Sequence, residues 1–285
     1  MVRRQQGTVL TERGVRHRAG VLGSPVAHSL SPVLHHAAYG ALGLHDWRYD
    51  AAQVEAAGLA AHVAGLGATW RGLSLTMPLK EAAFEVSTSV SDLARDTGSI
   101  NTLVRIRDGW SADNTDVHGI VAGLAGVGVG SVGSAVLIGS GATARSAVAA
   151  LTRLGAQRVT FMVRGAARAA TVAQARRAGL RVEEVPLGQW PAEVELVVST
   201  APPAATAELA TRLPEGGRAL LDVVYGEGTT RLVAAARDKG YAVVPGTEML
   251  LHQAGEQVRL MTGEPAPLAA MRRALGAALG AQDPA

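Results

Sequence analysis

Four short segments in the first half of the chain carry hydroxyl, amide and charged side chains that packing alone does not explain. Ser29 and Ser31 lie beside a predicted helix start, which makes them a good site for a carboxylate. Thr76 and Lys80 stand at the end of an apolar strand, and the last two segments add amides, hydroxyls and one acid. The segments are residues 23–32, 74–80, 101–102 and 114–116. They supply the candidate substrate-binding residues.

A glycine-rich turn in the second half has the form of a dinucleotide-binding fingerprint. An apolar strand over residues 134–139 runs into G-x-G-x-x-A and then into an alanine-rich helix. Gly139 would permit the tight turn, Gly141 would let a pyrophosphate approach the backbone, and Ala144 would allow close helix packing. The alternative is an ordinary tight turn between strand and helix. The predicted cofactor-binding residues of this turn are Gly139, Ser140, Gly141, Ala142, Thr143 and Ala144.

The end of the next strand indicates which dinucleotide would bind. A carboxylate at this place would bind the ribose 2′-hydroxyl of NAD, but the sequence has Arg164 there and Arg168 shortly after it. Two guanidinium groups attract a 2′-phosphate, so NADP is favoured and NAD is the weaker alternative. Solvated arginines without a ligand are the other interpretation.

These residues need elements to hold them, and the hydrophobic pattern predicts an α/β fold with two units. In the first unit we expect strands at 19–23, 47–50, 72–75, 102–107 and 110–112, with helices at 32–42, 54–66 and 79–86. Ser31 is the candidate cap of the first helix, and Pro32 suits its first turn. The sequence Asp108-Gly109 predicts a hairpin turn.

The second unit repeats the alternation of strand and helix and predicts a Rossmann-like domain. Its expected strands are 134–139, 158–163, 181–184, 195–199, 219–223 and 242–244, with helices notably at 142–154 and 166–177. Helices at 248–261 and 268–279 are expected to return to the first domain. The predicted boundaries are a disordered basic tail at 1–17, a substrate-binding catalytic domain at 18–115 completed by 248–285, and an NADP-binding domain at 116–247.

Composition sets limits on the class of protein. The 285 residues are 48% hydrophobic and 18% charged, which is typical of a globular enzyme. The net charge of +3 is spread along the chain, so we expect no nucleic acid partner. No early apolar run is long enough for a signal peptide or membrane span, so cytoplasm is the expected location. Cysteine is absent, and His28, His35 and His36 lack acidic partners, so we expect no metal.

Taken together, the motifs resemble the shikimate dehydrogenase family, and the resemblance runs from about residue 18 to about residue 265. The segment at 23–32 resembles its G-S-P-x-x-H-S-x-S-P, and the segment with Lys80 resembles its N-V-T-x-P-x-K. Residues 100–103 are similar to V-N-T-L, and 113–119 to x-N-T-D-x-x-G. Residues 222–225 and 246–253 match D-x-x-Y and G-x-x-M-L-x-x-Q. Several independent motifs in the same order make coincidence a poor explanation.

The resemblance implies a function and a role for each residue. The implied reaction is the reversible NADPH-dependent reduction of 3-dehydroshikimate to shikimate, in the biosynthesis of chorismate and aromatic amino acids. Lys80 and Asp116 would be the catalytic pair, because an ammonium near the carbonyl can stabilise the growing negative charge and donate a proton. Gly246 would belong to the cofactor site, and the enzyme would be a monomer or homodimer. The implied substrate-binding residues are Ser29, Ser31, Thr76, Asn101, Tyr225 and Gln253.

Other functions also fit the pattern. A quinate/shikimate or aminoshikimate dehydrogenase would share most of these motifs, and a non-catalytic NADP-binding sensor could retain the fold. Taken singly, Lys80 would be a solvated lysine and Asp116 a helix cap. The chain departs from the family at Ser74 and Leu79, where Asn and a polar or aromatic residue are usual. It also departs at 163–165, where N-R-T is usual, and at Glu227, which replaces a proline.

Overall fold

The computed structural model describes residues 14–226 and 228–280. Most of the predicted basic tail, and Glu227, lie outside these residues. The tail was predicted to extend to residue 17, and this boundary is wrong by one residue because the first strand already begins at His17. Within the described ranges, none of the helices combines the length and apolar character needed to cross a membrane.

The first sheet is mixed in direction. In the described residues it has six strands in the order β2-β1-β3-β5-β6-β4. Strands β1, β2 and β3 are mutually parallel, whereas β5 runs antiparallel to both β3 and β6. The short β4 pairs in parallel with β6. The bounds are β1 His17–Gly23, β2 Trp47–Gln53, β3 Trp70–Leu75, β4 Ser89–Val90, β5 Thr102–Ile106 and β6 Gly109–Asp113.

Helices and short turns connect these strands. The predicted helix at 79–86 is an α-helix continued by a 3₁₀ turn, and β4 and α4 were not predicted. The prediction of Ser31 as a cap is wrong, because Leu30 holds the cap position and Ser31 is the first helical residue. The Ser29 Oγ accepts a hydrogen bond from the Ser31 amide at 3.3 Å, so a side chain just before the helix satisfies its first amide. The bounds are α1 Ser31–Leu42, η2 Ala56–Gly58, α2 Leu59–Ala64, α3 Leu79–Ala82, η3 Ala83–Val86 and α4 Asp92–Thr97.

The second sheet has the strand order of a dinucleotide-binding fold. Its six strands in the described residues are all parallel, in the order β12-β11-β10-β7-β8-β9. The order reverses between β7 and β10, and open α/β sheets bind ligands beyond the carboxyl ends of the strands at such a reversal. The bounds are β7 Ser134–Ile138, β8 Arg158–Val163, β9 Arg181–Pro186, β10 Leu196–Ser199, β11 Ala219–Asp222 and β12 Ala242–Pro245.

The helices of this unit cover both faces of its sheet. Alanines of α6 (Ala142–Arg153), such as Ala144 and Ala147, are fully buried against one face, which explains why an alanine-rich helix follows the fingerprint. The remaining helical elements are α7 Ala169–Arg177, α8 Pro203–Thr206, η4 Ala210–Arg212 and α9 Arg231–Asp238. The Rossmann-like prediction is confirmed.

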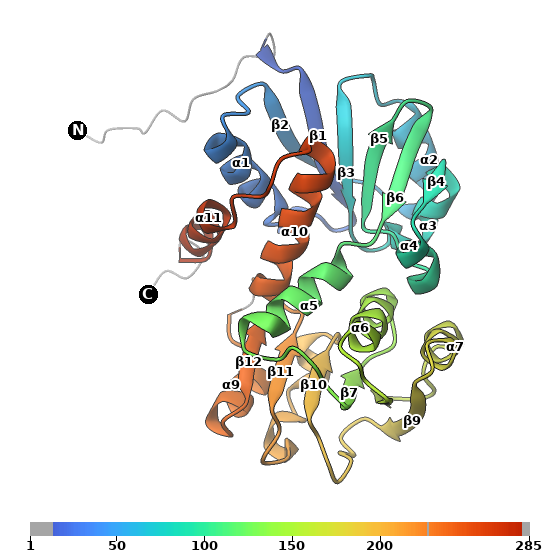
Figure 1. Cartoon of the computed structure of the whole chain (residues 1–285), viewed down its shortest axis with the longest axis vertical. Coiled ribbons are helices and arrows are strands. Elements are labelled where there is room, and N and C mark those ends of the chain that lie inside the picture. The colour runs from blue at the N-terminus through green and yellow to red at the C-terminus, as the bar shows by residue number, and fades with distance from the viewer. Residues whose placement is uncertain (1–13, 227, 281–285) are drawn as a thin grey trace, which may run out of the picture.

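Two helices join the units and lie side by side between them, as Figure 1 shows for α5 (Asp116–Gly126) and α10 (Gly246–Thr262). Gly119 permits this close packing, because a β-carbon there would lie 2.6 Å from the Met249 carbonyl oxygen. From α10 the chain turns into α11 (Leu268–Gly280), which returns to the first domain as predicted and packs there on α1. In the first sheet the carboxyl ends of β3 and β6 and the amino end of β5 lie side by side, and β6 leads into α5 at the junction.

Candidate active site

Lys80 and Asp116 meet at the junction of the two units. Lys80 lies in α3, just after β3, and Asp116 is the first residue of α5, just after β6. The Lys80 Nζ and Asp116 Oδ2 atoms are 2.5 Å apart, and the two side chains are only 15% and 7% exposed. The Ile100 amide donates to the Lys80 carbonyl oxygen at 2.8 Å, which ties the start of α3 to the residues before β5.

Asn101 fixes the acid of this pair. Its Nδ2 donates to Asp116 Oδ1 at 2.7 Å, so the two carboxylate oxygens have separate donors, Asn101 and Lys80. The Asn101 Oδ1 accepts from the Thr115 amide at 2.8 Å, and Gln253 Oε1 lies 3.3 Å from the Asn101 Nδ2. Asn101, Thr115 and Asp116 are all buried. Asp116 therefore accepts one hydrogen bond at each carboxylate oxygen, and its side chain is held in one orientation.

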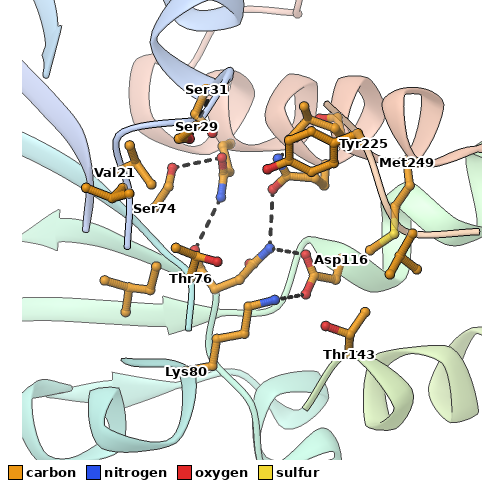
Figure 2. Close-up of a pocket in the computed structure, with 18 of the residues that line it drawn as sticks. Val21, Ser29, Ser31, Ser74, Thr76, Lys80, Asp116, Thr143, Tyr225 and Met249 are labelled. Carbon is orange, nitrogen blue, oxygen red and sulfur yellow. Dashed lines mark hydrogen bonds and ion pairs between the residues drawn. The ribbon is translucent and has the colours of Figure 1, made fainter. Parts of the chain in front are cut away.

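The pair lies in the wall of a cavity of about 170 Å³. A cavity of this size suits a small molecule. Figure 2 shows Lys80 and Asp116 facing each other beside Thr143, with Ser29 and Ser31 across the cavity. All predicted substrate-binding residues line this cavity, and so do Gly246 and Thr143 from the predicted cofactor set.

The end of the cavity opposite Lys80 is built from hydroxyl groups. Ser31 is the first residue of α1, Ser29 lies just before this helix, and Tyr225 lies in the segment after β11. Burial raises the pKa of Tyr225, and the nearby Asp116 carboxylate raises it further, so the phenol keeps its proton at neutral pH. Three hydroxyl donors at one end and an ammonium at the other suit an anionic molecule that also carries a carbonyl or hydroxyl group.

The glycine-rich turn has the geometry that a dinucleotide needs. Gly139 has φ of +100°, which a side chain would strain, and a β-carbon there would lie 2.7 Å from Thr200 Oγ1. Gly141 has open space at its β-carbon position, so a phosphate could approach the backbone at the start of the 12-residue α6. The residues therefore fit a diphosphate.

Two grooves continue from the cavity towards this turn. The first shares Thr76, Lys80 and Thr143 with the cavity and is also lined by Gly141, Ala142 and Ala144. The second shares Gly141, Arg168 and Thr200 with the first. It is also lined by the remaining predicted cofactor residues, Gly139, Ser140 and Arg164. The structure thus places every predicted site residue in one of three pockets that share lining residues.

Two groups of residues near the site were not predicted. Tyr49 donates to Ser74 Oγ at 2.6 Å, and Ser74 donates to Gln257 Oε1 at 2.8 Å beneath the cavity. Gln257 could have been found, because it lies one helical turn after Gln253 on the same face. Arg145 is a buried cation in α6, and its charge on the apolar face of an alanine-rich helix was the signal for it.

Comparison with known sequences agrees with this geometry. The model of the shikimate dehydrogenase substrate binding domain matches residues 21–103, and the shikimate 5′-dehydrogenase C-terminal domain matches 246–275. The shikimate dehydrogenase (NADP(+)) of Synechocystis sp. is 32% identical over 280 residues, covering 90% of this chain and 93% of the relative. The protein of the same name from Anaeromyxobacter sp. (strain Fw109-5) is 37% identical, covering 90% and 95%.

Solved structures are similar over most of the chain. The shikimate dehydrogenase of Mycobacterium tuberculosis has 44% identity and a TM-score of 0.85, covering 92% of this chain and 99% of that one. The enzyme of Thermus thermophilus, solved in complex with NADP(H) and shikimate, has 32% identity and a TM-score of 0.82, covering 92% and 99%. With the motifs, the fold and the site in agreement, the chain belongs to the shikimate dehydrogenase family.

Proposed function

We propose that this protein is an NADP-dependent shikimate dehydrogenase, which reversibly reduces 3-dehydroshikimate to shikimate. The observation that carries the proposal is the Lys80–Asp116 pair, which lies where a small polar cavity meets a groove from the glycine-rich turn. A substrate in the cavity and a nicotinamide reaching it along the groove would meet at this pair. The relatives named shikimate dehydrogenase (NADP(+)) support the same reaction.

The substrate is held at both ends in this proposal. Ser29, Ser31 and Tyr225 bind its carboxylate through their hydroxyls, and Thr76, Asn101 and Gln253 contact the ring hydroxyls. Six hydrogen-bonding side chains that converge on one cavity would position the ring with its carbonyl at Lys80. This orientation matters because a reacting group held in place reacts much faster than one that tumbles freely.

In this proposal Lys80 donates the proton, and Asp116 holds the Lys80 side chain in position. When bound, the nicotinamide supplies or accepts the hydride. The Lys80 ammonium stabilises the negative charge that develops on the substrate oxygen and then donates a proton to it. Asp116 already accepts hydrogen bonds from Lys80 and Asn101, so we assign it the orienting role. In the reverse direction Lys80 accepts the proton.

The cofactor follows the grooves in this proposal. Residues 139–144 would hold its diphosphate, Arg164 and Arg168 would hold the 2′-phosphate of NADP, and Gly246 would belong to the same cofactor site. We assign catalysis to residues 18–115 together with 248–285, and cofactor binding to residues 116–247. We also propose that the enzyme works in the cytoplasm, as a monomer or homodimer.

Steady-state kinetics of the purified protein test this function. Shikimate and quinate are each assayed with NADP⁺ and NAD⁺, and the highest kcat/KM is expected for shikimate with NADP⁺. Lys80→Ala should lower kcat by about 10²- to 10⁴-fold, the usual contribution of a general acid or base, while NADPH still binds. If neither substrate is turned over with either cofactor, or if Lys80→Ala keeps full kcat, the proposal is wrong.

A further inference from the structure

Arg145 is a buried cation that reaches from one unit to the other. It follows Ala144 directly, so it belongs to the helix that begins at the glycine-rich turn. The residue is 5% exposed. Its own backbone oxygen accepts from Gln174 Nε2 at 3.0 Å, which anchors it to α7. Its guanidinium points away from this unit, towards the helices that follow β3 and β4.

The guanidinium makes three hydrogen bonds on the other side of the junction. The Nε donates to the Thr97 carbonyl oxygen at 2.6 Å, and Nη2 donates to the Gly98 carbonyl oxygen at 2.9 Å. Both carbonyls lie at the end of α4, which lies beside α6 in Figure 1. The third bond runs from Nη2 to Glu81 Oε1 at 2.6 Å.

Glu81 is an acid in an unfavourable place for binding an anion. It lines the groove together with Gly141, Ala142, Thr143 and Ala144, and its side chain is 58% exposed. The other charged groups in that groove are Lys80, which is paired with Asp116, and Arg168. An uncompensated carboxylate at this position would repel the phosphates of a dinucleotide.

We infer that Arg145 is a positioning residue for the cofactor: it holds and neutralises Glu81, so that the groove before the glycine-rich turn accepts a diphosphate. The inference rests on the proposed path of the cofactor. Among the described residues, two of the three hydrogen-bond partners of the Arg145 guanidinium are backbone carbonyls, so the guanidinium keeps its place without Glu81. Glu81, in contrast, depends on Arg145. Removing either member of the pair therefore has opposite effects on the charge of the groove.

The effect should be the same for both nicotinamide cofactors. NADP and NAD share the diphosphate and differ only at the 2′-phosphate. Loss of Arg145 should thus weaken the binding of NADPH and of NADH by the same factor. Loss of Arg164 or Arg168 should instead weaken the binding of NADPH more than that of NADH. This equality separates charge compensation at the diphosphate from selectivity at the ribose.

Fluorescence titration of NADPH and NADH against the purified full chain tests the inference without turnover. We expect Arg145→Met to raise both Kd values roughly five- to tenfold at low salt, the scale for one uncompensated charge at a half-exposed position. The Glu81→Gln variant should bind NADPH and NADH at least as tightly as the original protein does. Arg145→Met with Glu81→Gln should recover most of the lost affinity. Arg153 is an exposed arginine of the same helix, so Arg153→Met is the matched control and should leave both Kd values unchanged.

The outcomes separate the possible roles of Arg145. If Arg145→Met binds normally, or if Glu81→Gln fails to restore its affinity, Arg145 has a purely structural role and the inference is overturned. If Arg145→Met does not fold, the inference is tested with Arg145→Lys and Glu81→Gln. Severalfold weaker binding of the cofactors by Glu81→Gln alone then overturns the inference. If the original protein binds neither cofactor, the proposed function fails as well. Normal binding by the original protein with unchanged variants refutes this inference alone.

Discussion

Replacing Gly119 with alanine adds one methyl group to α5 where it meets α10. The new β-carbon would lie 2.6 Å from the Met249 carbonyl oxygen, 3.0 Å from the Gln253 β-carbon and 3.2 Å from the Gln253 backbone nitrogen. Two of these three atoms are backbone, so no side-chain rotation can relieve the contact. The helix α10 must therefore move away from α5.

The expected magnitude follows from two opposing contributions. An extra methyl group in a packed core costs about 1–3 kcal/mol, whereas alanine gains about 1 kcal/mol over glycine from its helix propensity. The net result is a destabilisation of up to about 2 kcal/mol. Gly126→Ala, in the same helix, is the control because nothing lies within 4 Å of its β-carbon position. The free energy of unfolding of this control variant should be higher than that of the original protein by about 0.4–1 kcal/mol.

Thermal and urea unfolding of both variants measure this difference. About 2–4 °C in Tm per kcal/mol is usual for chains of 150–250 residues, so Gly119→Ala should melt several degrees below Gly126→Ala. Gly119→Ala should also lose kcat/KM, because α5 carries Asp116 and α10 carries Gln253. If Gly119→Ala is as stable as Gly126→Ala, the contact between these helices is looser than described and the reasoning is refuted.

Three further predictions concern other parts of the molecule. Burial lowers the pKa of His35 from 6.5 to about 3, so the folded state should lose about 1.4 kcal/mol per pH unit as pH falls from 6.5 towards 3. Urea unfolding across this range should show a weaker pH dependence for His35→Leu, and an unchanged slope would contradict the assignment. Arg164→Ala and Arg168→Ala should each lower the NADP⁺/NAD⁺ ratio of kcat/KM about tenfold, and equal losses with both cofactors would exclude a 2′-phosphate contact. Thr230→Ala should cost about 1–2 kcal/mol of unfolding free energy, because Thr230 caps α9 and donates to the buried Asp222 at 2.8 Å, and Thr230→Ser should restore most of it.

The sequence alone predicted much of the architecture because the relevant signals are local. Strand alternation, the glycine spacing at 139–144 and the alanine-rich helix that follows depend on neighbouring residues, so the Rossmann-like unit was recognisable. Local patterns failed where the elements were short. The two-residue β4 and six-residue α4 carry too few apolar residues to show a period, and Ser31 was given a cap position that Leu30 holds.

The candidate site was predicted as a set of residues, not as a geometry. Ordered motifs selected Lys80 and Asp116, but only the tertiary structure sets their side chains 2.5 Å apart and places Asn101 behind them. The partners of Arg145 were beyond prediction, since Glu81 in α3 and Arg145 in α6 are 64 positions apart and meet only in the tertiary structure. The chemical groups available to the site follow directly from residue type, so the sequence predicts them. Distances between residues far apart in the chain depend on how its elements pack, and no local pattern encodes them.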